Sequence, residues 1–295
     1  MKNVEELLSI ASKCVRCGTC KSFCPSYEVL RREGSGPRGR VTLAETSLKE
    51  AGTDGTPFGP AFQKYVKDCT LCGSCHSNCP NDVDVPALII AARTGYIAKE
   101  GLSPFASLAI KNLMSSERLR PLSMKLASKL QGLIFKGSST ERALVSRFSL
   151  PLIGGGRLVP NLPGKFFMES KTAKALARGP VSGSSKPKVS FFVGCGVNYF
   201  LPDIGEATVR VLERSGAALS IPKAQSCCGM PALSAGDRKT AREHALKNLE
   251  VFEKEDCDYI VTSCATCGHA LKGVFRELLC GGEGDDPEMA ARVDA

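Results

Sequence analysis

Eight of the fifteen cysteines lie in two N-terminal motifs that share one spacing. The segments CVRCGTCKSFCP and CTLCGSCHSNCP both follow the pattern C-x2-C-x2-C-x3-C-P. Three thiolates spaced in this way can wrap around one iron–sulfur cubane, while the fourth, followed by proline, reaches a second cluster. The spacing therefore predicts two 4Fe-4S clusters that exchange their fourth ligands. One is assigned to Cys14, Cys17, Cys20 and Cys79, and the other to Cys69, Cys72, Cys75 and Cys24.

Zinc is the alternative for these motifs, because C-x2-C pairs also build tetrahedral zinc sites. Such a site takes its four ligands as two pairs, whereas each motif here offers a run of four. The pattern favours iron–sulfur clusters.

A third constellation lies in the C-terminal third, at Cys195, the adjacent pair Cys227 and Cys228, and Cys264 and Cys267. Adjacent Cα atoms are about 3.8 Å apart, below the usual disulfide range, so the pair closes on itself only as a strained ring. The pair is therefore expected to serve a purpose other than a disulfide between its own two members, as part of a constellation of five thiols. Zinc and a reversible thiol pair are the alternatives to a cluster here.

The elements expected around these five thiols alternate between strand and helix. Strands are predicted at 188–195, 217–222 and 258–263, and helices at 202–216 and 237–255. This alternation is typical of a parallel sheet with helices on its faces, where ligands bind at the carboxyl ends of the strands. The five thiols are thus expected to converge on one sheet edge.

The N-terminal motifs are expected to lie among helices, since 4–13 and 85–101 carry apolar residues at helical spacing. The segment GSGPRG at 34–39 matches the dinucleotide fingerprint G-x-G-x-x-G. It carries Pro37 and follows YEVLRRE rather than a strand, so we do not interpret it as a nucleotide site. The predicted fold class is α+β multidomain: a mostly helical two-cluster ferredoxin domain (1–100), a basic helical connector and linker (101–187), and an α/β domain with a short parallel sheet (188–295).

The connector carries much of the positive charge, with 17 Lys or Arg and 4 Glu over 93–190. Two basic helices separated at Pro121 are predicted, and Leu122, Leu126 and Leu130 share one face. This face is interpreted as a core or partner-docking surface in preference to a membrane-surface helix. The charge itself fits anionic lipid, an acidic partner or a solvated linker, and no nucleic-acid partner is predicted.

Composition bounds where the protein works. The sequence has no cleavable apolar N-terminus and no run of 18 or more apolar residues. A secreted disulfide scaffold is not expected, and the predicted location is the cytoplasm, with peripheral contact at the cytoplasmic face of the membrane left open.

The cysteine pattern from Cys195 to Cys267 resembles the CCG module of the iron–sulfur subunits of glycolate oxidase, lactate utilisation proteins, anaerobic glycerol-3-phosphate dehydrogenase and heterodisulfide reductase. The N-terminal segment CVRCGTCKSFCPSYEVLRREGSGPRGR is also similar to the glycolate oxidase iron–sulfur subunit. Together these motifs span residues 14–268.

The resemblance implies an electron-transfer subunit that works beside a separate FAD-containing dehydrogenase of a 2-hydroxy acid and delivers electrons to a quinone or another membrane redox partner. In the heterodisulfide reductase branch the CCG cysteines hold a cluster that cleaves a disulfide, and this is the alternative function. Carried over by position, Cys195, Cys227, Cys228, Cys264 and Cys267 ligate a third iron–sulfur centre. Members of the group usually carry two CCG modules and this sequence shows one, so either the chain is truncated or a partner completes the site.

Several other residues were weighed and given no ligand role. Cys257 and Cys280 are interpreted as small buried hydrophobic residues. His76 and His269 adjoin predicted ligands, where hydrogen bonds can tune a cluster, but they are interpreted as loop residues. Arg38 and Arg40 could place positive charge near a cluster or a flavin subunit, or lie on a surface loop.

Overall fold

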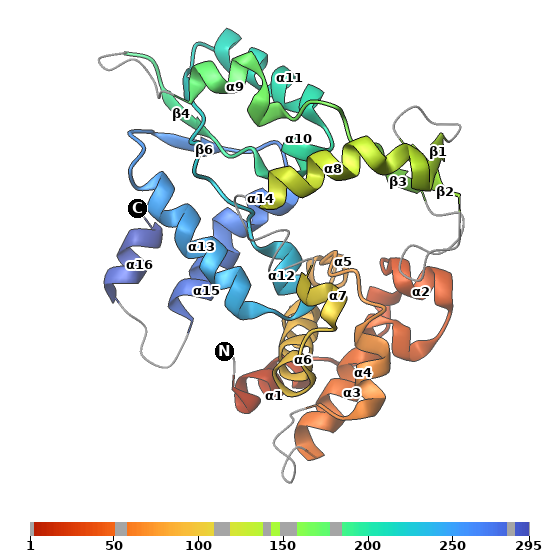
Figure 1. Ribbon diagram of the computed structural model, residues 1–295. Coiled ribbons are helices and arrows are strands. Elements are labelled where there is room, and N and C mark those ends of the chain that lie inside the picture. Colours follow the sequence, from red (N-terminus) through yellow and green to blue (C-terminus); the bar gives the residue numbers. More distant parts are fainter. Residues whose placement is uncertain are drawn as a thin grey trace. The chain divides into compact units, whose positions relative to one another are not determined.

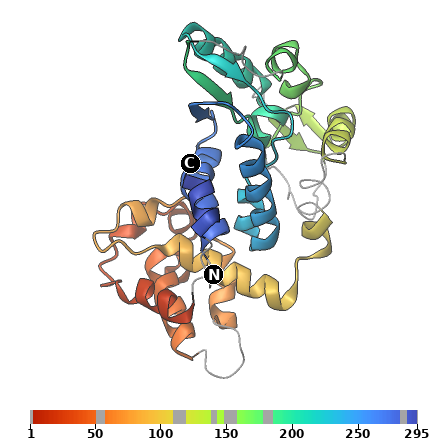
Figure 2. The same ribbon diagram turned by 90° about the vertical axis from the view of Figure 1, so that its left-hand side faces the viewer.

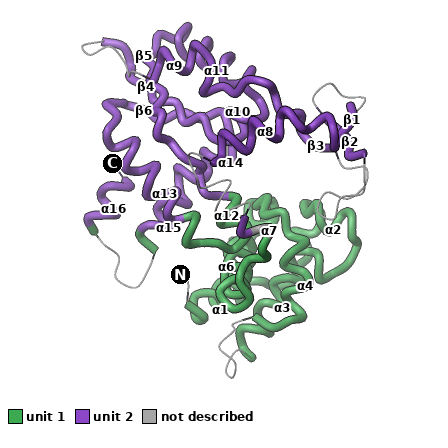
Figure 3. The backbone as a smooth tube through the Cα atoms, viewed as in Figure 1, with its two compact units in different colours: residues 1–106, 231–241, 280–287 green, residues 107–230, 242–279, 288–295 purple. Residues whose placement is uncertain are grey.

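The computed structural model describes residues 3–50, 58–108, 119–137, 143–147, 158–177, 185–281 and 287–294. The chain forms two compact units (Figure 3). Unit 1 comprises residues 1–106, 231–241 and 280–287, and unit 2 comprises 107–230, 242–279 and 288–295. The two units are described separately below.

The secondary structure of unit 1, in its described residues, consists of helices joined by loops. Its N-terminal helices are α1 Val4–Ser12, α2 Pro25–Leu30, α3 Pro37–Glu50, α4 Pro60–Val66, α5 Ser74–Ser77, α6 Val85–Glu100 and α7 Pro104–Ser107. Short 3-10 turns η1 (Thr19–Lys21) and η2 (Glu33–Ser35) join them. Helices α1, α3, α4 and α6 pack into one bundle (Figures 1 and 2).

The helix ends follow local sequence signals. The Asn3 side chain accepts a hydrogen bond from the Glu6 N–H at the start of α1, and Asp84 accepts one from the Ala87 N–H at the start of α6. Helix α6 ends at Gly101, whose φ is 75°. The expected helices at 4–13 and 85–101 are therefore confirmed.

An apolar core holds the bundle together. Phe62, Leu88 and Ile89 are fully buried between α4 and α6, with Leu7 and Val41 contributed by α1 and α3. Burial of each such side chain stabilises the fold by about 1.5–3 kcal/mol relative to exposure. This core is the rigid support of both N-terminal cysteine motifs.

The glycine-rich segment 34–39 lies between α2 and α3 and serves packing. A Cβ on Gly34 would lie 2.6 Å from the Tyr65 ring, and one on Gly39 would lie 2.1 Å from the carbonyl oxygen of Glu33. The glycines are therefore required by close approach of ring and backbone. Helix α2 precedes this segment, which runs through η2 into the first turn of α3. A dinucleotide site would instead have a strand before the glycines and a helix after them.

Unit 2 contains a three-stranded parallel sheet in the order β5-β4-β6, with β4 Lys188–Phe191, β5 Ala218–Ser220 and β6 Tyr259–Val261. Val189 pairs with Leu219 on one side and with Tyr259 on the other. The helices that follow and connect the strands are α10 Gly194–Tyr199, α11 Pro202–Arg214, α12 Met230–Ala235, α13 Arg238–Phe252, α14 Ala265–His269, α15 Phe275–Cys280 and α16 Pro287–Asp294. Of these, most of α12 and the first turn of α13 belong to unit 1. Residues Ala270–Val274 between α14 and α15 are π-helical.

The core of unit 2 joins this sheet to segments that precede it. Phe191 and Val209 pack with Phe167, which lies in the 3-10 turn η4 (Phe167–Glu169). Helix α9 (Lys171–Leu176) adds Ala173 to the same core. Residues 166–176 thus support the sheet. The predicted α+β fold, a helical two-cluster region followed by an α/β region with a short parallel sheet, is confirmed.

The region before η4 differs from its predicted form. Helix α8 (Leu119–Ile134) contains Pro121 in its first turn, where a missing N–H costs little, so the proline does not separate two helices there. Leu122, Leu126 and Leu130 are exposed and not part of a core. The rest of the first predicted helix lies outside the described residues. A small antiparallel sheet, which the sequence did not indicate, follows in the order β1-β2-β3: Phe135–Gly137, Ala143–Ser146 and Leu158–Pro160.

In the described part of the chain, every helix is too short or too polar to cross a membrane.

Candidate functional site

The two N-terminal motifs adopt the same backbone turns. In the first, Arg16 and Gly18 have φ values of 59° and 86°, and the 3-10 turn η1 follows. In the second, Leu71 and Gly73 at the equivalent positions have φ values of 55° and 75°, and α5 follows. Left-handed residues bend the chain sharply, and glycine adopts this conformation without a steric cost. Each loop therefore curls around a space beside its own cysteines.

The thiols gather into two groups whose fourth members are exchanged. Around Cys20, burial raises the pKa, and the neighbouring thiolates of Cys14, Cys17 and Cys79 raise it further. We call these four the first thiol group. The exchange of the fourth cysteine between two clusters stays a prediction.

The second thiol group comprises Cys24, Cys69, Cys72 and Cys75. Burial raises the pKa of Cys75 to about 12, and the other three members, together with Cys20, raise it further. Cys20 of the first group is close enough to raise the pKa of Cys75 in the second, so the two groups are neighbours.

The donor set fits iron–sulfur clusters. Cys14, Cys69, Cys75 and Cys79 pack against the apolar core, where crowded thiolates are unfavourable without a compensating cation. Four thiolates on zinc all lie about 2.3 Å from a single atom, whereas thiolates on a cubane bind separate irons. Two groups of four thiols can therefore hold one cubane each.

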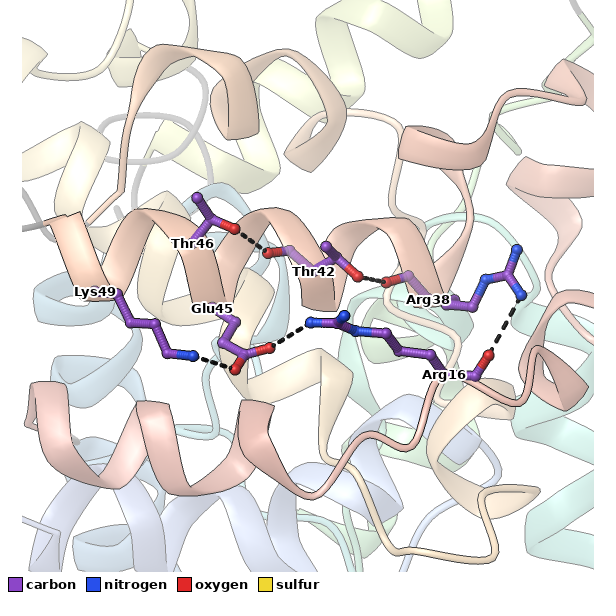
Figure 4. A network of polar contacts seen from close by, with 6 residues as sticks. All are labelled: Arg16, Arg38, Thr42, Glu45, Thr46 and Lys49. Atoms are coloured by element: carbon purple, nitrogen blue, oxygen red, sulfur yellow. Dashed lines mark hydrogen bonds and ion pairs between the residues drawn. The ribbon is translucent and has the colours of Figure 1, made fainter.

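Helix α3 anchors the loop of the first thiol group through a polar network (Figure 4). Arg38 donates to the backbone oxygen of Arg16 at 3.4 Å, and Arg16 donates to Glu45 at 3.3 Å. Glu45 also accepts from Lys49 at 2.7 Å, and this bond, with Arg16, lowers its pKa. Arg38 bonds to Glu33 as well, at 2.7 Å. Of the two arginines singled out in the sequence, Arg38 therefore lies beside the first thiol group.

A half-buried arginine, Arg93, contacts the backbone of the second thiol group, and the buried Arg40 lies near it. Arg93 donates to the backbone oxygens of Cys69 at 2.6 Å, Val66 at 2.8 Å and Ser234 at 2.6 Å. Arg40 is 1% exposed and donates to the Tyr65 oxygen at 3.2 Å. Sequence reasoning missed Arg93, because one cation in an apolar helix is usually interpreted as solvated.

The C-terminal cysteines follow the carboxyl ends of the three parallel strands, as predicted. Cys195 lies in α10 after β4, Cys227 and Cys228 lie in the loop after β5, and Cys264 and Cys267 begin α14 after β6. Four of these thiols form a chain of hydrogen-bonded neighbours in the order Cys195, Cys227, Cys228, Cys267. Cys264 is the N-cap residue of α14.

Hydrogen bonding and burial raise the pKa of three of these thiols, Cys195, Cys227 and Cys228. The hydrogen bond to Cys227 and burial raise the pKa of Cys195 far above its usual value. Cys195 lowers the pKa of Cys227, but Cys228 and burial outweigh it, and the result is about 11. Thiolates in this place need a cation, so the set is suited to a metal centre.

The vicinal pair is held by a buried clamp on α13. Asn248 is 0% exposed; its side chain accepts from the Ser226 N–H at 2.8 Å and donates to the Cys227 oxygen at 2.9 Å. The Ser226 hydroxyl lies 3.1 Å from Nδ1 of His244, also on α13. Both α13 residues escaped the sequence analysis, because polar residues on a charged helix give no signal of burial.

A cavity of about 180 Å³ adjoins the C-terminal thiols. Its lining includes Cys195, Cys227, Arg120, Lys223, Phe166 and Tyr199. The two cysteines are thus accessible from a space with both positive and aromatic walls.

Four further residues that the sequence analysis considered have the following positions. Cys280 is buried and Cys257 is half-buried. His76, inside the second motif, lies 3.6 Å from the Asp82 carboxylate. His269 ends α14.

Two domain families match the chain. Residues 10–83 match the 4Fe-4S dicluster domain, and residues 189–272 match the CCG cysteine-rich domain. No solved structure matches the chain.

Curated relatives cover much of the sequence. The probable glycolate oxidase iron–sulfur subunit of Bacillus subtilis is 28% identical over 96% of this chain and 62% of its own length. One subunit of the CoM/CoB fumarate reductase of Methanothermobacter marburgensis is 27% identical over 88% of this chain and 42% of its own. Lactate utilization protein A of Bacillus cytotoxicus is 44% identical over 36% of this chain and 41% of its own. The chain spans about half the length of the curated relatives it matches.

Proposed function

The chain belongs to the iron–sulfur proteins that join a 4Fe-4S dicluster domain to a CCG cysteine-rich domain, and we propose that it is an electron-transfer subunit. In this proposal a partner FAD-linked dehydrogenase subunit oxidises a 2-hydroxy acid of the glycolate or lactate type. The chain receives the electrons and passes them to an acceptor such as a quinone.

The observation that carries the proposal is the pair of adjacent thiol groups with exchanged fourth cysteines. When bound, each 4Fe-4S cluster takes up and releases one electron. The first thiol group is proposed to hold one cluster and the second thiol group the other. The bundle core excludes water behind both groups, and the polar network on α3 keeps the first loop in place.

Two relatives support the partner. One is named as an iron–sulfur subunit of glycolate oxidase and another as a lactate utilization protein. A protein named as a subunit works beside other chains. In this proposal the flavin chemistry therefore belongs to a separate subunit.

The test is anaerobic reduction of the purified chain by the FAD-containing subunit of a glycolate or lactate dehydrogenase, with glycolate, lactate and glycerol 3-phosphate supplied separately. We expect substrate-dependent bleaching of the cluster absorbance. Cys72→Ser should abolish part of the signal, while Cys280→Ser, a matched change outside the thiol groups, should retain it. Clusters that dithionite reduces but that no flavin subunit reduces would contradict the proposal.

A second candidate function is reduction of a disulfide at a centre held by the C-terminal thiols. It is favoured by the cavity that Cys195 and Cys227 line, and one relative is named as a CoM/CoB fumarate reductase subunit. A third iron–sulfur cluster at Cys195, Cys227, Cys228, Cys264 and Cys267 belongs to this proposal, with zinc as its alternative. If Cys227→Ser and Cys228→Ser leave disulfide reduction unchanged, this candidate fails.

A further inference from the structure

Two arginines, the buried Arg40 and the half-buried Arg93, converge on the carboxyl-terminal end of α4. The Arg40 guanidinium bonds to the backbone oxygen of Tyr65, and Arg93 bonds to those of Val66 and Cys69. The carbonyl end of a helix carries partial negative charge, which offsets part of the cost of burying a cation. Cys69 belongs to the second thiol group, so Arg93 contacts the backbone of that group, and Arg40 lies near Arg93.

These cations lack a carboxylate. Among the described residues, the ion pairs include neither Arg40 nor Arg93. One terminal nitrogen of Arg40 is buried without a hydrogen-bond partner. Burial lowers the pKa of Arg93, the Cys69 thiolate opposes this shift, and Arg40 adds to it. Buried charge of one sign is strongly unfavourable unless an opposite charge compensates it.

The first thiol group has a different electrostatic setting. Its cation, Arg38, is partly exposed and bonds to the Glu33 carboxylate at 2.7 Å. Glu33 also pairs with Lys21 at 2.9 Å. The positive charge near the first group is therefore largely paired with a carboxylate, whereas Arg40 and Arg93 bond to backbone oxygens, and Arg40 is withdrawn from water.

We propose that Arg93, with Arg40 beside it, supplies the counter-charge of the cluster held by the second thiol group and makes it the higher-potential cluster of the two. This inference rests on the proposed function. Four thiolates give a 4Fe-4S cluster a net negative charge, and reduction makes it more negative. A buried cation stabilises the reduced state more than the oxidised state, so it raises the potential. Electrons are then expected to rest on the second cluster.

The test is a redox titration of the full chain, followed by electron paramagnetic resonance, for wild type, Arg93→Gln, Arg93→Lys and Arg38→Gln. We expect two midpoint potentials in the wild type. Arg93→Gln should lower the upper one by at least a tenfold change in the reduction equilibrium, about 59 mV for one electron. Arg93→Lys should leave the upper midpoint potential close to its wild-type value, because the charge is kept. Arg38→Gln should not change the upper midpoint potential. An upper potential that Arg93→Gln does not move overturns the inference.

Iron content separates the failures. A wild-type chain that binds fewer than about eight irons, four for each of two cubanes, contradicts the proposed function itself. A chain with eight irons whose upper potential is insensitive to Arg93 contradicts only the present inference. If Arg93→Gln loses the second cluster, Arg40→Gln gives a second reading, with a shift in the same direction expected. If both neutral variants lose that cluster and Arg93→Lys keeps it, the charge is required, as proposed; loss in Arg93→Lys as well overturns the proposal.

Discussion

Replacement of Asn248 by alanine is expected to loosen the vicinal cysteine loop while the rest of the chain stays folded. The Asn248 side chain bonds to both sides of the Ser226–Cys227 peptide, at 2.8 and 2.9 Å, from a fully buried position. Without it the Ser226 N–H is buried and unpaired, which costs about 1–3 kcal/mol. The Cys227 oxygen retains the Ser226 hydroxyl as a donor, so its loss adds only about 0.5–1.5 kcal/mol.

Alanine has a higher helix propensity than asparagine, and on α13 this offsets about 0.5 kcal/mol of the destabilisation. The net local destabilisation is therefore about 1–4 kcal/mol. Because each 1.4 kcal/mol is tenfold, amide hydrogen exchange in a peptide covering residues 225–229 should accelerate about 5- to 700-fold. The assay is exchange followed by mass spectrometry on the full chain, with peptides of α6 as an internal reference.

A matched control is Glu250→Ala, at an exposed position of the same helix. It should leave exchange in 225–229 within about twofold of the wild type. If Asn248→Ala also leaves this segment unchanged, or if α6 exchanges faster to the same extent, the clamp does not hold the vicinal pair.

Three further perturbations have definite expected outcomes. Cys75→Ser should reduce bound iron by about four atoms per chain, whereas Cys280→Ser should leave it unchanged, as measured by iron and sulfide analysis. Gly236→Ala should destabilise unit 1 by about 1–3 kcal/mol in denaturant melts, since its φ is +95° and a Cβ would lie 2.5 Å from a backbone oxygen of α6; an unchanged midpoint would refute this packing. Bonds to Arg38 and then to Lys21 lower the pKa of Glu33, so the contribution of Glu33 to stability is present above pH 4.5 and lost as the pH falls through the lowered value. Melting temperature between pH 6 and 3.5 should therefore fall more in the wild type than in Glu33→Gln, and parallel curves would contradict the assignment.

Local patterns in the sequence predict much of the C-terminal sheet. Strands and helices alternate over 188–263, and the strands are clear apolar runs. Gly216 marks the end of the helix predicted at 202–216. Because parallel strands share a carboxyl edge, this order alone brings the cysteine positions together. The same reasoning could not reveal Phe167 in the core, since its partners lie beyond a segment rich in glycine, proline and serine.

The supporting residues of the sites are harder to predict than the cysteines. Thiol spacing is a local signal, and it predicts the exchange of Cys24 and Cys79 between the two groups. Arg93 and Asn248 matter because of backbone oxygens and N–H groups that lie far away in the sequence or on another element. Composition and periodicity carry no record of such contacts. The exposed leucines of α8 show the converse, because helical spacing of apolar residues does not by itself establish burial.

The central claim is that the two N-terminal motifs hold two 4Fe-4S clusters. The most direct measurement is iron, acid-labile sulfide and zinc per chain on protein purified without oxygen. The account predicts about eight irons and eight sulfides from the two thiol groups, rising to about twelve irons if the C-terminal thiols hold a third cubane. Zinc in place of iron would contradict the account, because zinc has no redox chemistry and can neither accept nor release an electron in a protein.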